Sequence, residues 1–383
     1  MFTDIGGHRP ARRTALDRSP IGLIRKALAS PVVTKVTSPH HPDEYLTLLH
    51  PMLTVEAVRG RVVDVIRETG AASTVVLRPN GAWSGFTPGQ HVEFGVEVEG
   101  TRRVRVFSVS SSAERKDGMF SVSVKAHPDG YVSQFLHAGS LRPGTVVYLS
   151  PASGEFVLPK RVPEHILLIS GGSGITPVMS MLRTLADRGH RGRVTFLHYA
   201  RSRDDEMFSI ELDAMAELPF VDMVRVYTRD PEPDARLHGR ITLDHLHGLG
   251  LDPATTPTWV CGPAGLIATV TELYTDLDAR DQLTAEYFKV PSVDLDAEDA
   301  TGAVSFDASG VDAPNSGATI LEQAEAAGLS PVYGCRMGVC NTCAVKKLHG
   351  AVRHVISGEV SADTDETIKV CVNVPVGDVA VDL

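Results

Sequence analysis

Four cysteines in the C-terminal quarter of the chain have the spacing of ligands to an iron–sulfur centre. Cys335, Cys340 and Cys343 form a C-x4-C-x2-C run, and Cys371 follows in the segment V-C-V-N-V-P. This is the ligand spacing of a [2Fe-2S] cluster, for which one loop supplies three thiolates and a distant strand supplies the fourth. We therefore predict that these four cysteines bind a [2Fe-2S] cluster.

Two other uses of the cysteines remain open at this point. A structural zinc site usually pairs its cysteines as two C-x2-C knuckles, and this sequence has one. Disulfides are typical of secreted proteins, whereas this chain has 5 Cys in 383 residues and no secretory signal, as expected for an intracellular protein. The loop must curl to deliver three thiolates, and Gly334 and Gly338 would allow the turns. The iron–sulfur interpretation is therefore favoured.

Length and composition predict a soluble protein of two or three domains. Hydrophobic residues make up 43% of the 383 residues and charged residues 22%, which is ordinary for globular proteins. The net charge of −10 argues against nucleic acid as a partner. No apolar run is long enough for a transmembrane helix.

The first segment, residues 1–54, is basic and rich in proline. Residues 1–55 contain seven Lys or Arg and four acids, a net charge of +3. Residues 21–28 read I-G-L-I-R-K-A-L, an amphipathic stretch. A peripheral contact with a membrane surface and a mitochondrial presequence are alternatives, but the apolar stripe is short for membrane binding. We expect this stretch to pack on the domain that follows.

Residues 55–160 contain short β-type runs separated by Gly and Pro, a pattern that predicts a small antiparallel barrel. On one predicted strand, Arg105 and Phe107 alternate, so the guanidinium could hold a phosphate while the ring covers a flat cofactor. Ser108 could hydrogen-bond to that cofactor. Gly130 and Ser133 begin a helical stretch, where backbone N–H groups could bind a pyrophosphate.

Residues 161–290 predict a parallel α/β domain. Residues 166–170 form a continuous apolar run, typical of a strand buried on both faces, and G-G-S-G-I-T-P follows at once, with a helix expected from Val178. Glycines let the backbone approach a dinucleotide pyrophosphate, whose charge the helix N-terminus favours. The pattern differs from G-x-G-x-x-G, which argues against an ordinary Rossmann dehydrogenase.

Further strand-like runs in this region end in arginines or in a C-G-P turn. Arg201, Arg203 and Arg229 follow the second and third predicted strands, where guanidinium groups could pair with a ribose 2′-phosphate. Surface ion pairs of Arg203 with Asp204 and Asp205 are the alternative. We expect NADPH as the donor, with NADH as the alternative.

Taken together, these motifs resemble the ferredoxin–NADP reductase superfamily. The matching stretches are R-V-F-S at 105–108, G-Y-V-S at 130–133, G-G-S-G-I-T-P at 171–177, C-G-P at 261–263 and E-Y-F at 286–288. The resemblance implies that Arg105 binds a flavin phosphate, Phe107 lies against the ring system and Ser108 lies near N5. Phe107 stands where Tyr is common, so any hydrogen bond from that hydroxyl would be absent.

The resemblance also implies the remaining site residues. Cys261 would lie beside the nicotinamide C4, and Glu286 and Phe288 would close over the flavin and nicotinamide. The Gly130–Ser133 turn favours FAD, with FMN as the alternative. The other cofactor-binding residues implied are Val106, Val124, Lys125, Val132, Gly171, Gly172, Gly174, Thr176, Pro177, Gly262 and Pro263.

After a linker at residues 291–300, residues 301–383 resemble the plant-type ferredoxin domain. A strand at 304–306 and a helix at 319–328 precede the cysteine loop. The expected fold class is multidomain α+β: an antiparallel β-barrel flavin domain, a parallel α/β nicotinamide domain and a β-grasp ferredoxin domain.

This order of modules predicts an NAD(P)H oxidoreductase, because flavin can take up a hydride and release electrons singly to an iron–sulfur cluster. The N-terminal segment, with D-E-Y-L at 43–46 and L-H-P at 49–51, resembles actinobacterial reductases that serve membrane fatty-acyl desaturases and related hydroxylases. A reductase for a Rieske oxygenase or cytochrome P450 and a non-enzymatic redox sensor are the alternatives.

Charge offers a hint about the electron acceptor. Residues 297–383 contain twelve acids and five Lys or Arg, a net charge of −7. An acidic ferredoxin domain would steer towards a basic patch on an acceptor protein, although general solubility explains the same acidity. We expect a cytoplasmic monomer, brought to the inner face of the membrane through its partner.

Overall fold

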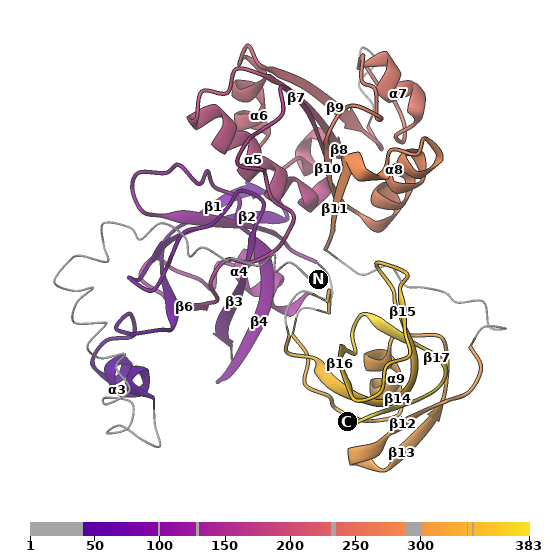
Figure 1. Cartoon of the computed structure of the whole chain (residues 1–383). Helices are drawn as coiled ribbons and strands as arrows, with labels where there is room; N and C mark the ends of the chain where they lie inside the picture. Colours follow the sequence, from indigo (N-terminus) through magenta and orange to yellow (C-terminus); the bar gives the residue numbers. More distant parts are fainter. Residues whose placement is uncertain are drawn as a thin grey trace, which may run out of the picture. The chain divides into compact units, whose positions relative to one another are not determined.

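The computed structural model describes residues 41–98, 100–127, 130–230, 235–288, 300–334, 336–338 and 341–383 (Figure 1). Two compact units are distinguished within the chain. The first contains the described residues up to Arg103, Phe107–Leu158 and Met179–Gly189; the second contains Val104–Val106, Pro159–Val178 and the described residues from His190. In these ranges no helix has the length and apolar character needed to cross a membrane.

A six-stranded antiparallel sheet forms the predicted barrel. Its order is β4-β3-β6-β1-β2-β5, and the bridge between Val109, after β4, and Val122, in β5, links the two ends of this order. The strands are β1 (Val58–Thr69), β2 (Ala72–Pro79), β3 (His91–Val98), β4 (Thr101–Ser108), β5 (Phe120–Lys125) and β6 (Val146–Leu149).

The barrel closes because alternate residues of its strands are apolar and point inward. Val75, Leu77, Phe94 and Phe120 have at most 1% of their surface exposed, and they pack with Leu136 of α4 (Tyr131–His137). The predicted antiparallel barrel is confirmed.

The second sheet is parallel and has the strand order β11-β10-β7-β8-β9. Its strands are β7 (His165–Gly171), β8 (Arg193–Ala200), β9 (Val221–Tyr227), β10 (Thr258–Gly262) and β11 (Leu283–Tyr287). The chain adds β8 and β9 on one side of β7, and then returns to add β10 and β11 on the other side. The carboxyl ends of β7 and β10 therefore form the switch point at which doubly wound sheets bind ligands.

Helices cover both sides of this sheet, as an α/β domain requires. Figure 1 shows α6 (Ser209–Ala216) on one side, and α7 (Leu243–Gly248) and α8 (Ala264–Asp276) on the other. Helix α5 (Ile175–Asp187) follows the turn after β7. Short 3-10 turns occur at Gly172–Gly174, Arg203–Asp205 and Arg280–Gln282. Helix α5 begins at Ile175, before the expected Val178, because the first turn of a helix tolerates Pro177.

The C-terminal domain is a mixed sheet with one helix, the predicted β-grasp arrangement. The strand order is β13-β12-β17-β14-β15, with β16 paired to β14, and helix α9 (Ile320–Ala326) packs on its core. The Thr319 side chain and Glu322 cap α9 reciprocally. The strands are β12 (Ala303–Phe306), β13 (Val311–Pro314), β14 (Ala344–His354), β15 (Val360–Ser361), β16 (Glu366–Lys369) and β17 (Asn373–Val381), with a 3-10 turn at Asp307–Ser309.

Helix α3 (Pro42–Leu49) is fastened to the start of the barrel by one buried carboxylate. Asp43 accepts hydrogen bonds from the backbone N–H groups of Val55, Glu56 (3.2 Å) and Ala57 (2.9 Å). These N–H groups lie just before β1. The amphipathic stretch at 21–28 lies outside the described residues.

We predict that Asp43→Ala lowers the free energy of unfolding by about 2–3 kcal/mol, because three hydrogen bonds to a charged group, one of them buried, are lost. Differential scanning calorimetry should show an earlier unfolding transition. Glu155→Gln, an exposed substitution in the same unit, is the control and should leave the transition unchanged. Equal transitions in both variants would contradict this role of Asp43.

Candidate functional site

The turn after β7 touches the turn after β10 through backbone atoms. A Cβ at Gly174 would overlap the Cys261 carbonyl group and the Gly262 nitrogen, so only glycine fits there. A Cβ at Gly262 would likewise lie 3.0 Å from the Gly171 nitrogen. The glycines predicted for dinucleotide binding are therefore brought together at the switch point of the sheet.

The same turn presents an open cradle in front of α5. Gly172 has φ +52°, and a Cβ placed on it would meet nothing within 4 Å. Thr176, whose hydroxyl donates to the Ser173 carbonyl at 3.1 Å, and Pro177 lie in the first turn of α5. Backbone N–H groups at the start of this 13-residue helix can bind an anion, so the residues fit a dinucleotide phosphate.

Cys261 is completely buried at the end of β10. It stands opposite Glu286 of β11 in the parallel register, and Phe288 follows that strand. Burial, and secondarily the neighbouring Glu286 carboxylate, raises the pKa of the Cys261 thiol well above its usual value. The side chain is therefore a neutral thiol that can pack against a ring, and it is not a nucleophilic thiolate.

The arginines predicted near the ribose differ in their contacts. Arg201 donates twice to Asp205, at 2.8 and 3.1 Å, and Arg203 donates to Asp213 at 3.0 Å. The Arg203 partner is thus Asp213, whereas the sequence had suggested Asp204 or Asp205. Arg229 is exposed, and its guanidinium has no hydrogen-bond or ion-pair partner in the described part of the chain. Its N–H donates to the Arg201 carbonyl at 2.9 Å, which links the two arginines.

The predicted flavin residues of β4 lie at its carboxyl end. Ser108 is 4% exposed, and Phe107 is half-buried with its ring edge against Phe94, 5.8 Å between centroids. Arg105 is half-buried and donates to the neighbouring Val104 carbonyl at 2.8 Å. Val106 lies between them on the strand. Phe107 is therefore partly held by the barrel core, and its remaining surface is accessible.

The turn before α4 uses the predicted hydroxyl for its own structure. Ser133 donates to the Gly130 carbonyl at 2.8 Å and accepts from the His127 N–H at 3.1 Å. A side chain on Gly130 would collide with the Ser133 oxygen. Val132 is buried under this turn, and Val124 and Lys125 end the neighbouring strand β5. Ser133 therefore shapes the turn through both of its hydrogen-bonding directions.

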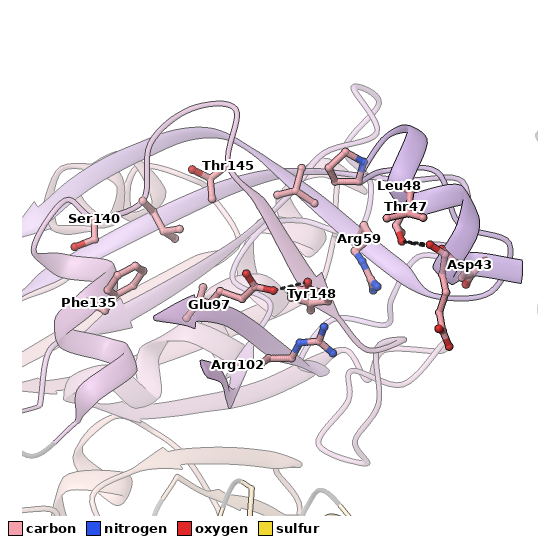
Figure 2. A pocket seen from close by; sticks show the side chains of 15 residues that line it. Asp43, Thr47, Leu48, Arg59, Glu97, Arg102, Phe135, Ser140, Thr145 and Tyr148 are labelled. Atoms are coloured by element: carbon pink, nitrogen blue, oxygen red, sulfur yellow. Dashed lines mark hydrogen bonds between the residues drawn. The ribbon is translucent and has the colours of Figure 1, made fainter. Parts of the chain in front are cut away.

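A separate cleft of about 710 Å³ lies between α3 and the barrel (Figure 2). Tyr148 is clasped by two guanidinium groups, with Arg102 3.5 Å and Arg59 4.3 Å from the ring centroid, and its hydroxyl donates to Glu97 at 2.7 Å. Burial lowers the pKa of Arg59 from its ordinary value. None of the residues predicted to bind flavin lines this cleft. The contacts of Tyr148, on β6, connect it with β1, β3 and β4, so they tie neighbouring strands of the barrel together.

Strand pairing in the C-terminal domain brings two of the predicted cluster ligands together. Cys343 immediately precedes β14, and Ala344 pairs with Lys369 at the end of β16, two residues before Cys371. The two sulfur atoms are 3.2 Å apart, and the residues are 1% and 4% exposed. Cys343 and Cys371 do not form a disulfide in this structure. Two buried, converging thiols fit ligation of an iron–sulfur cluster.

The rest of the cysteine loop is only partly described. Cys335 and Cys340 lie outside the described residues, and among those that are described no cluster of three metal-binding side chains occurs. Gly338 has φ +73° and passes so close to Val372 that a Cβ would lie 2.8 Å from its side chain. Among the described residues of the loop, Arg336 (φ 57°) also has a left-handed backbone.

Three protein families match successive parts of the chain. Residues 71–158 match the oxidoreductase FAD-binding domain, residues 168–272 the oxidoreductase NAD-binding domain and residues 306–375 the 2Fe-2S iron-sulfur cluster binding domain. Their order is the order of the three sheets described above. The match supports FAD and a [2Fe-2S] cluster as the resident groups, with a pyridine nucleotide as substrate.

A relative over nearly the whole length decides the family. The chain is 36% identical over 356 residues to the NADPH oxidoreductase of Mycobacterium tuberculosis, covering 92% of this chain and 91% of the relative. It belongs to the ferredoxin–NADP reductase superfamily. The chain is also similar to the glycine betaine monooxygenase reductase subunit of Chromohalobacter salexigens. The two are 29% identical, and the alignment covers 84% of this chain and 94% of the relative.

The solved structure of phthalate dioxygenase reductase has the same fold. It is 22% identical, with a TM-score of 0.55, and the alignment covers 85% of this chain and 97% of that structure. The protein is thus a ferredoxin–NADP reductase-type oxidoreductase with a C-terminal [2Fe-2S] domain, and it transfers electrons from NAD(P)H through FAD to the cluster.

We predict that Gly174→Ala raises the KM for NAD(P)H at least about tenfold. The added methyl group must push the turns after β7 and β10 apart, at a cost of about 1–3 kcal/mol. Steady-state reduction of ferricyanide measures the effect. Gly265→Ala is the matched control, because a Cβ at Gly265 meets nothing within 4 Å. If both variants keep the KM of the parent protein, the contact does not shape the site.

Proposed function

We propose that this protein is the NADPH-dependent reductase component of an oxygenase-type system, and that its acceptor is a membrane fatty-acyl desaturase or hydroxylase. A soluble Rieske oxygenase or a cytochrome P450 is the alternative acceptor. The observation that carries the reductase assignment is the presence of all three redox modules in one chain, because together they can pass electrons from NAD(P)H through FAD to the cluster.

Relatives support an oxygenase-type acceptor. One is a reductase subunit of glycine betaine monooxygenase, and the phthalate dioxygenase reductase fold covers most of this chain. The desaturase proposal depends on the D-E-Y-L and L-H-P stretches of the N-terminal segment. In the structure these stretches form α3 and the turn after it, and Asp43 holds them on the barrel. Such a partner would bring the protein to the inner face of the membrane.

When bound, FAD and the [2Fe-2S] cluster supply hydride acceptance and single-electron transfer. The side chains hold and orient these groups. Arg105 would pair with a flavin phosphate, the accessible side of Phe107 would cover the ring system, and Ser108 would offer a hydrogen bond at the ring edge. Catalysis by the protein would then be mainly positioning in a near-attack arrangement.

At the switch point, neutral Cys261 would pack beside the nicotinamide, and Glu286 and Phe288 would border the same space. The uncharged state of Cys261 suits this place, because a thiolate would favour the cationic nicotinamide over the neutral reduced form. Cys343 and Cys371, with Cys335 and Cys340, would ligate the cluster. The lack of exposure at Cys343 and Cys371 would keep water from the metal.

For the donor, Arg229 supports NADPH over NADH. Its exposed guanidinium follows β9, and it lies next to Arg201 through a backbone hydrogen bond. A ribose 2′-phosphate would supply the anionic partner that Arg229 lacks in the described chain. Arg201 would join in this binding if the phosphate competes with Asp205.

The acceptor is tested by reconstitution under anaerobic and then aerobic conditions. The purified protein is first titrated with NADPH to confirm reduction of the flavin and cluster bands, and is then mixed with membranes that contain a di-iron fatty-acyl desaturase. We expect NADPH-dependent double-bond formation. Product only with a soluble Rieske oxygenase or P450 would favour the alternative, and full reduction of the protein with neither acceptor active would overturn the oxygenase-type assignment.

We predict that Arg229→Gln raises the KM for NADPH about tenfold and leaves the KM for NADH nearly unchanged, because one charge-assisted contact to the 2′-phosphate is lost. Arg203→Gln is the matched control, since its guanidinium is engaged by Asp213. Parallel changes for both nucleotides would argue against a 2′-phosphate contact.

We predict that Cys371→Ser abolishes the cluster but preserves reduction of the flavin by NADPH. The serine oxygen replaces a buried thiolate ligand. Iron analysis and the visible spectrum report the cluster, and stopped-flow absorbance reports the flavin. Cytochrome c reduction should fall by more than about tenfold, as electron exit through the cluster requires; an undiminished rate would contradict this exit.

A further inference from the structure

The cysteine loop is fastened to the sheet by a lysine that the sequence motifs do not include. The Lys369 ammonium donates a hydrogen bond of 2.6 Å to the Gly338 carbonyl oxygen, which lies between the ligands Cys335 and Cys340. Lys369 is half-buried and ends β16, two residues before Cys371. One side chain therefore links the loop with three ligands to the strand that leads to the fourth.

The backbone around Lys369 is also fixed. Its carbonyl accepts hydrogen bonds from the Asn373 side chain at 3.0 Å and from the Val372 N–H at 3.1 Å. The next residue, Val370, donates its N–H to the carbonyl of the ligand Cys343 at 3.2 Å. Gly338 also rests directly on Val372, so its carbonyl is held beside the ammonium group.

The positive charge of Lys369 is not paired with a carboxylate in the described part of the chain. The nearby Glu366 carboxylate accepts from Ser361 at 2.6 Å and pairs with the buried Lys347 at 3.1 Å. Glu359 accepts from Ser357 at 3.3 Å. This contrasts with Lys346 on β14, which forms an exposed ion pair with Asp365 at 2.7 Å.

We propose that Lys369 is a positioning residue for the iron–sulfur centre: its ammonium closes the cysteine loop through Gly338, and its unpaired charge makes reduction of the centre more favourable. Uptake of one electron, supplied by NAD(P)H through FAD, would add one negative charge to the cluster that the four thiolates hold. A cation held beside the loop, in a partly buried place where screening is weak, stabilises that charge. The overall acidity of the domain acts in the opposite direction, so Lys369 offsets it locally.

The test measures the midpoint potential of the cluster in the full-length protein by mediated titration, followed by electron paramagnetic resonance. Lys369→Met should shift the midpoint to more negative potential, so that the equilibrium constant for reduction falls about tenfold, which is ~59 mV for one electron. Lys369→Arg should stay close to the parent protein. Lys346→Met, the matched control, should change the constant by less than about twofold because that charge is exposed and already paired.

Further variants separate the charge from the hydrogen bond. Lys369→Gln keeps an N–H donor for Gly338 but loses the charge, so it should shift the midpoint as Lys369→Met does. If Met and Gln variants hold no iron while Arg does, a cation is required to close the loop, which supports the proposal. Equal midpoints for Met, Gln and parent proteins, or loss of iron in the Arg variant also, would overturn it. These readouts need no acceptor protein, so they are independent of the proposed partner.

Discussion

The nicotinamide domain depends on one close approach between two pieces of backbone. The turn after β7 lies against the turn after β10 with no room for a Cβ at Gly174. This contact places the open cradle at Gly172, the start of α5 and the thiol of Cys261 around a single point. Because the parallel register then sets Glu286 beside Cys261, one steric requirement organises residues from three separate parts of the chain.

In the cluster domain, strand pairing brings the functional residues together. Residues flanking Cys343 and Cys371 belong to strands that pair antiparallel, and the pairing brings the two sulfur atoms to 3.2 Å before any metal is considered. A loop alone would lose much conformational entropy in gathering four thiolates. The sheet, with α9 packed on its core, makes part of that arrangement a property of the fold.

The sequence was most informative where the chemistry depends on neighbouring residues. The glycine-rich turn, the C-G-P turn and the cysteine spacing each lie within a few residues, so fold class and the dinucleotide site could be predicted. Contacts between residues that lie far apart in the sequence could not be predicted. Asp43 with the N–H groups before β1, the two arginines on Tyr148 and Lys369 on Gly338 join positions that have no local pattern.

Local patterns also did not reveal which side-chain contacts hold the loop turns in place. Gly334 and Gly338 were expected to allow the turns of the cysteine loop, but the sequence did not indicate that Arg336 is left-handed too. Its guanidinium contacts Glu325 and stacks 3.9 Å from the Tyr333 ring centroid. Side-chain contacts of this kind can compensate for a backbone that glycine would adopt more easily. Similarly, Ser133 carries the hydroxyl that the motif requires, yet its hydrogen bonds shape the turn.

The attachment of α3 to the barrel through Asp43 limits where the chain can be cut when gene fusions are made. The barrel strands begin at Val58, the first residue of β1, so a gene fusion that exchanges the leading segment could be cut just before this residue. A cut there would remove the Asp43 carboxylate and expose backbone N–H groups that it satisfies. The part of the chain that can be transferred as a unit therefore begins at Pro42. A replacement N-terminal segment must either end before α3 or supply a hydrogen-bond acceptor in place of Asp43.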